Sequence, residues 1–339
     1  MEYRSDELLT RLLRDVSRSF YLTLRVLPPP VRPQIGLAYL LARTTDTIAD
    51  TEIIPLEQRL AALSALRARI LGETNELPAL GELSSKQGNP AEQILLQRIP
   101  EAVHLLDQTP GEDKKLIREV LDTITSGQVL DLNRFAGAGK NKLVALQTDA
   151  TLDDYTYRVA GCVGEFWTKI CRRHLFPQAK IDDAWLLAEG IRYGKGLQLI
   201  NILRDLPRDL RQGRCYMPAE TLAKHGLTKE DLLKPETEAK FRPLYNSYLS
   251  LATEHLAAGW NYTLALPKGC VRVRLACAWP ILIGARTLRK LESETILNPQ
   301  HRVKVSRTEV WTDVLGSIAL YPTPWWSRLV RLKLLNEPK

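Results

Sequence analysis

The sequence predicts an all-α fold, and three observations support this. Apolar residues recur at spacings of three and four through most of the chain, as they do along one face of a helix. Alternating patterns that predict strands are scarce. The 339 residues are 45% hydrophobic and 25% charged, and no composition shift marks a domain boundary. A single helical domain with a large core is therefore expected, and the lack of a fixed-period repeat counts against a solenoid.

The helices can be assigned in order along the chain. A charged N-terminal helix ends at the proline-rich stretch 26–34, because proline cannot donate a hydrogen bond within a helix. Residues 34–50 are apolar on most faces, which predicts an interior helix. Residues 56–71 are amphipathic, and the Gly, Pro, Ser and Asn content of 72–90 predicts a loop. The remaining helices are expected at 91–107, 112–135, 152–174, 183–205, 218–224, 236–266, 269–292 and 306–317.

Charge and cysteine content narrow the function classes. The formal net charge of +8 favours an anionic partner: nucleic acid, acidic lipid or a phosphorylated substrate. Nucleic acid is disfavoured, because the acidic residues gather on interior-type helices. Five cysteines without a CxxC pair indicate buried thiols in a reducing compartment, and no zinc-ligand spacing is present. Without a secretory signal or a run of ~20 apolar residues, a cytoplasmic protein is expected.

Two aspartates interrupt the apolar stretch "LARTTDTIAD" at 41–50. Asp46 and Asp50 are four positions apart, so both carboxylates should extend from the same face of the helix. Unpaired carboxylates are costly to bury, so they require water, basic partners or a cation. The stretch therefore predicts a polar site built into an otherwise apolar helix.

A second acidic pair lies in "GLQLINILRDLPRDLRQGRCYMP" at 196–218. Asp205 and Asp209 repeat the four-residue spacing, and Gln198 and Asn201 precede Asp205 on the same helical stripe. Pro207 is expected to disturb the helix just past Asp205, which leaves the direction of Asp209 open.

The two acidic pairs together predict a magnesium site that binds a diphosphate. Magnesium prefers oxygen ligands and keeps waters or substrate phosphates in its coordination shell. Arg43 and Arg204 lie beside the pairs and could hold a diphosphate leaving group. An apolar helical cavity would take the hydrocarbon part and exclude water from a carbocation. An isoprenyl diphosphate fits these requirements, while solvated helix faces are the alternative reading of each acidic pair.

Four motifs appear in order and at plausible spacing: "SRSF" at 17–20, "YLLARTTDTIAD" at 39–50, "YTYRVAGCVGEFW" at 155–167 and "QLINILRDLPRDLRQGRCYMP" at 198–218. Through them the chain resembles the squalene/phytoene synthase family, from about residue 10 to about residue 292. The resemblance implies an isoprenoid synthase helical bundle with a central cavity over residues 1–300, followed by a C-terminal extension at 301–339. It also implies magnesium-dependent head-to-head (1′-1) joining of two prenyl diphosphates.

The resemblance assigns roles to individual residues. The implied ligands of magnesium are Asp46, Asp50, Asn201, Asp205 and Asp209. The implied contacts to diphosphate are Ser17, Ser19, Arg43, Gln198, Asn201, Arg204 and Arg214. Tyr39, Arg43 and Tyr155 are implied in the reaction itself. Taken alone, Tyr39 and Tyr155 would more often be core tyrosines, and "VAGCVG" also suits close helix packing.

Among the products made in this family, squalene is expected, formed from two farnesyl diphosphates through presqualene diphosphate with NADPH as reductant. The sequence "CVGEFW" resembles the corresponding motif of bacterial squalene synthases. The basic residues that could bind the NADPH phosphate are Arg302, Lys304 and Arg307. Ala276 and Ile281 depart from the aromatic residue and glutamine of animal-type squalene synthases. The alternatives are a phytoene synthase using a longer prenyl diphosphate, a dehydrosqualene or presqualene diphosphate synthase, and a noncatalytic prenyl-diphosphate-binding protein.

The C-terminal stretch "YPTPWWSRLVRLKLL" combines apolar and cationic residues: Trp325, Trp326, Leu329 and Leu332 with Arg328, Arg331 and Lys333. This composition is typical of a helix that lies in a membrane interface beside anionic lipid. Peripheral contact with the cytoplasmic membrane face is one expectation, and packing of the tail on its own bundle is the other.

Overall fold

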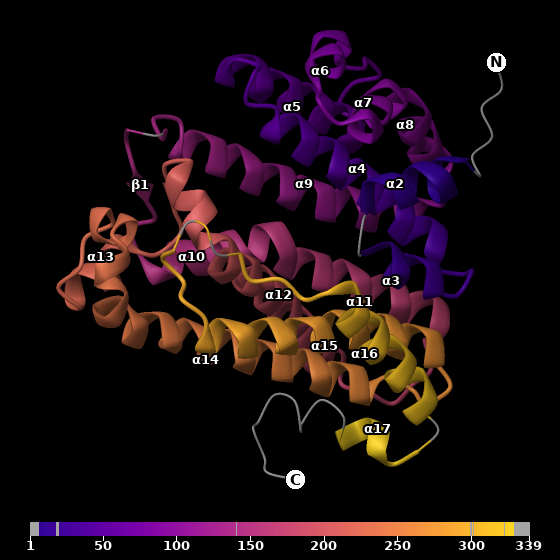
Figure 1. Ribbon diagram of the computed structural model, residues 1–339. Coiled ribbons are helices and arrows are strands. Elements are labelled where there is room, and N and C mark those ends of the chain that lie inside the picture. Colours follow the sequence, from indigo (N-terminus) through magenta and orange to yellow (C-terminus); the bar gives the residue numbers. More distant parts are fainter. Residues whose placement is uncertain are drawn as a thin grey trace. The chain divides into compact units, whose positions relative to one another are not determined.

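The computed structural model describes residues 7–17, 20–139, 141–298, 300, 302–321 and 323–328. The all-α prediction is confirmed, since helices make up nearly all the regular structure of these residues (Figure 1). Two short strands, β1 (Val144–Ala145) and β2 (Arg214–Cys215), pair in parallel. Within the described ranges, no helix combines the length and apolarity needed to span a membrane.

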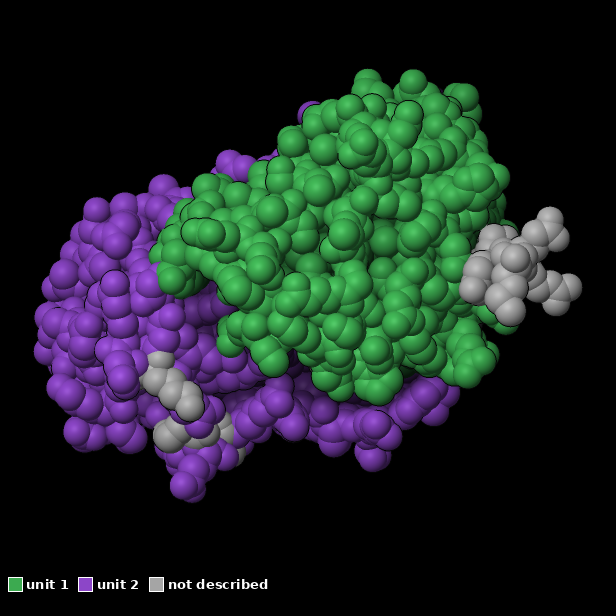
Figure 2. Space-filling model, turned by 90° about the horizontal axis from the view of Figure 1, so that it is seen from above, with its two compact units in different colours: residues 1–136, 166–179 green, residues 137–165, 180–339 purple. Residues whose placement is uncertain are grey.

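The chain divides into two compact units (Figure 2). Unit 1 consists of Met1–Ala136 and Phe166–Ala179, and unit 2 of Gly137–Glu165 and Lys180–Lys339. Neither unit is one continuous segment. Wherever the extension predicted at 301–339 is described, it belongs to unit 2.

Unit 1 is built around α4 (Arg32–Asp50), which packs against α5, α7, α8 and α9. Leu40, Leu41 and Ile48 of α4 are fully buried, as expected for an interior helix. The other helices of unit 1 are η1 (Leu8–Leu12), α2 (Leu13–Ser17), α3 (Tyr21–Val26), α5 (Leu56–Leu71), α6 (Gly81–Lys86), α7 (Pro90–Gln97), α8 (Ile99–Gln108) and α9 (Gly111–Arg134).

Two expectations for unit 1 were wrong. The predicted loop at 72–90 contains the short helix α6. The single helix predicted at 91–107 is divided at Arg98 into α7 and α8. Pro100 lies in the first turn of α8, where its missing N–H needs no partner, whereas a continuous helix would lose a hydrogen bond there.

Unit 2 is built around α12 (Asp183–Arg211), which packs against η3, α14 and α15 (Figure 1). Preceding it are α10 (Asp149–Thr156), η3 (Tyr157–Gly161) and α11 (Cys162–Leu175), whose residues from Phe166 onward belong to unit 1. The later helices are α13 (Ala219–Lys224), η4 (Glu230–Leu233), η5 (Pro235–Thr237), α14 (Glu238–Ala265), α15 (Val271–Ser293), α16 (Arg307–Leu320) and α17 (Trp325–Arg328).

Side-chain caps fix where several helices begin. The side chains of Asn89, Thr148, Asp182 and Ser306 each accept a hydrogen bond from a backbone N–H of the first helical turn. At α16, Glu309 completes a capping box by accepting from the backbone of Ser306. These polar residues satisfy N–H groups that have no partner inside the helix, and so they set the start of each element.

The small residues of "VAGCVG" permit close packing in unit 2, as the sequence suggested. A Cβ atom on Gly164 would lie 1.9 Å from the carbonyl oxygen of Gly190. A Cβ atom on Gly194 would lie 2.1 Å from the carbonyl oxygen of Ala160. Any side chain at either position would separate this segment from α12, whose C-terminal half carries the second acidic pair.

The predicted end of α12 near Asp205 was wrong, because the helix continues through Pro207 to Arg211. Proline has no N–H to bond the carbonyl of Leu203 four residues earlier. Tyr245 of α14 supplies that bond, since its buried hydroxyl donates to Leu203 O at 3.1 Å. The helix therefore crosses the proline with this carbonyl satisfied.

All five cysteines are free thiols, and those at 162, 171, 215 and 277 are buried. Burial raises the pKa of both Cys162 and Cys215 to about 12. These two side chains are therefore neutral thiols that serve as small apolar core residues.

Candidate active site

The first acidic pair lies on the C-terminal half of α4, in unit 1. Asp50 is exposed, whereas Asp46 is half-buried and accepts a hydrogen bond from Nε2 of Gln128 on α9 at 2.5 Å. Desolvation by the surrounding protein, and then the charge of Asp50, raise the pKa of Asp46 to about 6. Two like charges in a poorly hydrated place repel each other, so this pair favours a bound cation.

Arg43 and Tyr39 lie one and two helical turns before Asp46. Nη2 of Arg43 forms an ion pair with Glu92 of α7, and its buried Nε has no hydrogen-bond partner. The ring of Tyr39 stacks on Phe20, with ring centroids 5.3 Å apart. Glu92 thus holds a guanidinium beside the acidic pair.

The first motif is only partly described. Ser17 is buried at the end of α2, and its hydroxyl donates to Leu13 O at 2.5 Å. This bond satisfies the hydroxyl hydrogen within its own helix and leaves the oxygen as an acceptor. Ser19, the other serine predicted to contact diphosphate, lies outside the described residues.

The second acidic pair lies on α12, in unit 2. Asp205 and Asp209 are one turn apart on a continuous helix, which settles the direction of Asp209 that the sequence left open. Together with Gln198 and Asn201 they form a partly exposed polar stripe. The neighbouring apolar residues are buried: Leu199, Ile202, Leu203 and Leu206. This helix therefore presents amide and carboxylate oxygens from an apolar setting.

Arg204 forms a two-pronged ion pair with Asp205. Nε lies 3.0 Å from Oδ1 and Nη2 lies 2.6 Å from Oδ2. The hydrogen bond to Asp205 raises the pKa of Arg204, so the guanidinium stays charged. Each acidic pair thus has an arginine within its own unit: Arg204 contacts Asp205 directly, and Arg43 interacts electrostatically with Asp46.

Tyr155, on α10, stacks against Tyr216, with centroids 4.9 Å apart and hydroxyl oxygens separated by 3.4 Å. Tyr216 follows β2, whose Arg214 pairs with Val144 of β1. Gly213 has φ of +84°, and a Cβ atom there would lie 2.3 Å from the backbone N of Gly139. Only glycine fits, so this turn fixes the positions of Arg214 and Tyr216.

Three residues of these clusters were not predicted from the sequence: Gln128, Glu92 and Tyr216. Gln128 and Glu92 lie in helices whose patterns gave no sign of a site, and they reach α4 only through tertiary packing. Tyr216 could have been found, because it belongs to the fourth motif, "GRCYMP".

The donors suit a divalent cation that shares its ligands with a substrate. Over the described ranges, no three His, Cys, Asp or Glu side chains converge to hold a metal on their own. The carboxylates instead occur as pairs, with Asp46 and Asp50 in unit 1 and Asp205 and Asp209 in unit 2. Magnesium bound by such a pair would complete its shell with water and phosphate oxygens.

The basic residues predicted to grip NADPH lie apart from these clusters in the sequence and are exposed. Arg302 and Lys304 precede α16, and Arg307 is its first residue. Nothing in their contacts assigns them a ligand, so their role in cofactor binding stays a prediction.

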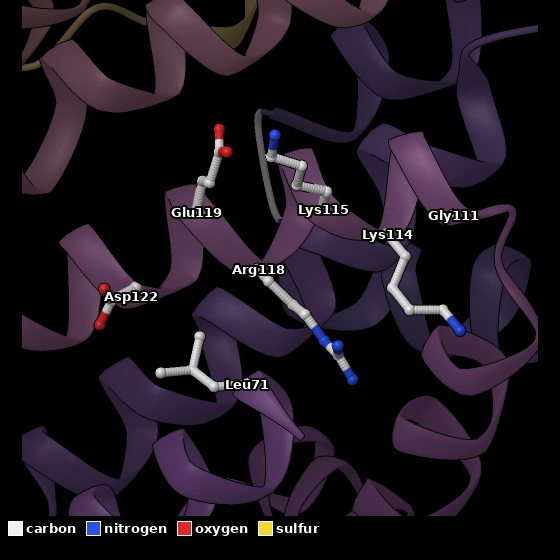
Figure 3. A pocket seen from close by; sticks show the side chains of 7 residues that line it. All are labelled: Leu71, Gly111, Lys114, Lys115, Arg118, Glu119 and Asp122. Atoms are coloured by element: carbon white, nitrogen blue, oxygen red, sulfur yellow. The ribbon is translucent and has the colours of Figure 1, made fainter. Parts of the chain in front are cut away.

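A pocket of about 280 Å³ opens beside α9 in unit 1 (Figure 3). Two of its cations cap helix ends: Arg118 donates to Ile70 O at 2.8 Å, and Lys114 to Asp107 O at 2.7 Å. None of the predicted site residues lines it, and we assign it no role in the reaction.

Comparison with known proteins decides the family. A model described as squalene/phytoene synthase matches residues 13–309. The chain belongs to the squalene/phytoene synthase family. It is 31% identical over 301 residues to a presqualene diphosphate synthase of Zymomonas mobilis, covering 87% of this chain and 88% of that protein. It is 26% identical to the squalene synthase of Schizosaccharomyces pombe, covering 91% of this chain and spanning 64% of that protein's length.

Solved structures of the squalene/phytoene synthase family share the fold. The structure of TcSQS with the ligand BPH1237 superposes with a TM-score of 0.78 at 23% identity, over 99% of this chain and 93% of that chain. A dehydrosqualene synthase complex gives a TM-score of 0.64 at 18% identity, over 94% of this chain and 97% of that chain. The chain is therefore a prenyltransferase of isoprenoid biosynthesis with the all-α fold of this family.

Proposed function

We propose that this enzyme joins two farnesyl diphosphates head to head into presqualene diphosphate, with magnesium, and reduces this intermediate to squalene with NADPH. The observation that carries the proposal is the repeated pairing of two carboxylates with an arginine. Arg43 lies one helical turn before Asp46 of the first pair, and Arg204 is bonded to Asp205 of the second. Two such clusters match the need to bind two diphosphate groups.

In this proposal, the polar residues of α12 orient the diphosphate and stabilise the charge that develops as it leaves. Magnesium, when bound, would add Lewis acid stabilisation of that leaving group. Asp205 and Asp209 would hold the ion together with Asn201. Arg204, already fixed by Asp205, can direct its remaining N–H groups to phosphate oxygens. The same positive charge would disfavour the return of the diphosphate to bulk water.

The stacked Tyr155 and Tyr216 support handling of the cation in this proposal. Aromatic faces stabilise a nearby positive charge through their electron-rich rings. The 3.4 Å separation of the hydroxyls would let one phenol orient the other toward a departing proton. Tyr216 is 7% exposed and Tyr155 is half-buried, so the ring of Tyr216 is the one shielded from water.

The reduction of presqualene diphosphate to squalene is a separate step of the proposal and has its own support. It is supported by the likeness to a protein named squalene synthase and by the expectation from the "CVGEFW" motif. A second candidate ends at presqualene diphosphate, and the full-length likeness to a presqualene diphosphate synthase favours it. At the two positions that depart from animal-type squalene synthases, Ala276 and Ile281 are buried apolar residues of α15.

Product analysis tests the proposal. The purified chain would be incubated with farnesyl diphosphate and magnesium, with and without NADPH, and the lipids identified by mass spectrometry after dephosphorylation. We expect squalene only with NADPH, and presqualene alcohol without it. Presqualene alcohol under both conditions would refute the reductive step and support the second candidate.

Two controls make the product assay specific. Asp205→Asn should lower turnover by ~100-fold or more, as expected for lost stabilisation of the leaving group. Asp183→Asn, an exposed acid in the first turn of the same helix, should leave turnover unchanged. If no product forms from farnesyl diphosphate, formation of phytoene from geranylgeranyl diphosphate would redefine the substrate, and no product from either would favour a noncatalytic role.

A further inference from the structure

The outward face of α16 is apolar although it meets solvent. Trp311, Leu315 and Ile318 recur at spacings of four and three, so they form one stripe along the helix. Their exposed fractions are 49%, 60% and 47%. The short helix α17 contacts α16 (Figure 1). Its Trp325 is 59% exposed. We refer to these four residues as the α16–α17 patch.

The acidic residues of α16 point away from this patch. Asp313 is 4% exposed and forms an ion pair with Arg286 of α15. Glu309 pairs with Lys290 at 3.0 Å. Since these are the two carboxylates of α16, none remains on the outward stripe to repel an anionic partner.

Cations lie at both ends of the patch in the sequence. Arg307, Lys304 and Arg302 are exposed at the start of α16. At the other end, the guanidinium of Arg328 lies 5.4 Å from the ring centroid of Trp325. Arg307 is four residues before Trp311 and so falls on the same stripe, which gives the patch one cation there and a second, Arg328, beside Trp325.

Trp326 fixes the end of the patch to the bundle. Its ring packs against Trp260 and Tyr321, with centroid distances of 4.8 and 4.9 Å, and the guanidinium of Arg274 lies 4.7 Å from it. Of the two adjacent tryptophans, one is thus part of the core and the other faces solvent. Trp326 therefore packs on the chain's own bundle, as one of the two expectations for the tail had it. Trp325 is exposed, as the interfacial expectation requires.

We infer that the α16–α17 patch docks on the surface of an anionic lipid bilayer. A helix that lies in a membrane interface has an apolar face with tryptophan at the headgroup level, cations that contact anionic headgroups, and few acids on that face. The patch has each of these features, and it is carried on a helix that two ion pairs, Asp313–Arg286 and Glu309–Lys290, hold to α15. With 14 residues, α16 is long enough to lie on the bilayer surface but too short to cross the membrane. The inference does not rest on the proposed reaction.

Vesicle binding tests this inference. The full-length protein would be mixed with vesicles of phosphatidylcholine alone, or of phosphatidylcholine and phosphatidylglycerol in equal amounts, and the bound fraction measured by flotation. We expect stronger binding to the anionic vesicles, which added salt weakens. Trp311→Ser with Leu315→Ser should reduce binding to anionic vesicles by ~10-fold or more, because two half-exposed apolar side chains no longer enter the interface.

Matched measurements separate the outcomes. Trp185→Ser removes an exposed tryptophan of α12 and should leave vesicle binding unchanged. Thermal unfolding and turnover of soluble substrate should be the same in wild type and in the patch variant, since the substituted side chains are exposed. Unchanged vesicle binding in the patch variant would overturn the inference. So would a wild-type dimer in sedimentation that the patch variant abolishes, because a second copy of the chain would then cover the patch.

Discussion

The hydroxyl of Tyr245 takes the place of the N–H that Pro207 lacks. It donates at 3.1 Å to Leu203 O, the carbonyl that a residue other than proline at position 207 would bond from within α12. The helix consequently runs on to Arg211, and Asp209 stays one turn beyond Asp205 on the same face. A contact from α14 thus preserves the geometry of the second acidic pair.

Removing this hydroxyl should destabilise the protein. Tyr245→Phe leaves Leu203 O buried without its partner, which should lower the free energy of unfolding by ~1–3 kcal/mol. Pro207→Ala restores an N–H at position 207, so the same tyrosine substitution should cost less in that background. A double-mutant cycle from denaturant unfolding measures the coupling. Additive effects would mean that the two residues act independently.

Asp46 should limit the stability of the metal-free enzyme. Its folded pKa of about 6 lies above the value of 3.8 for a free aspartate, so stability falls as pH rises through this interval. Asp46→Asn should therefore raise the free energy of unfolding above pH ~6 by ~1–3 kcal/mol, measured in a chelator. The same substitution should lower turnover by ~100-fold or more.

The pH dependence provides the control for Asp46. Well below pH ~4 the wild-type carboxyl is protonated in both folded and unfolded protein, so the stability gain of Asp46→Asn should vanish there. Asp183→Asn, at an exposed residue of α12, is the comparison variant. A variant less stable than wild type above pH ~6 would show that the carboxylate is stabilised by its surroundings instead.

Gln128 is expected to position Asp46. Gln128→Leu removes the donor to Asp46 Oδ1, so turnover should fall and half-maximal activity should require ~10-fold more magnesium, as is typical when a ligand loses its supporting hydrogen bond. Gln97→Leu, an exposed glutamine of α7, is the matched control. Magnesium titrations of activity would separate this role from simple loss of folded protein, and an unchanged titration would argue against it.

Glycine should be required at position 164. Gly164→Ala places a Cβ atom 1.9 Å from Gly190 O, so the helices must separate, and the free energy of unfolding should fall by ~3 kcal/mol or more. At Gly316 of α16 a Cβ atom meets nothing within 4 Å, so Gly316→Ala should instead stabilise by ~0.5–1 kcal/mol. Thermal unfolding of both variants checks this pair. Similar effects at the two positions would contradict the packing argument.

The sequence predicted the features that depend on neighbouring residues. The interior position of α4, the long helices of unit 2 and the four-residue spacing of each acidic pair follow from helical periodicity, which is a local property. These expectations were confirmed because no distant contact opposes them.

The features that the sequence missed depend on contacts between distant residues. Gln128 is 82 positions from Asp46, and Glu92 is 49 positions from Arg43, so no local pattern could connect them. The continuation of α12 through Pro207 is a tertiary effect that overrides a local rule.

The interleaving of the two units constrains the order in which the chain can fold during synthesis. Asp113, 2% exposed on its side chain, lies 2.9 Å from Nε2 of His174, which belongs to the second segment of unit 1. When only the first segment of unit 1 has been synthesised, Asp113 is present but its partner His174 is not. Completion of unit 1 must wait until residue 179 has emerged, by which time residues 137–165 of unit 2 are already outside. The nascent enzyme thus cannot finish one unit before it begins the other.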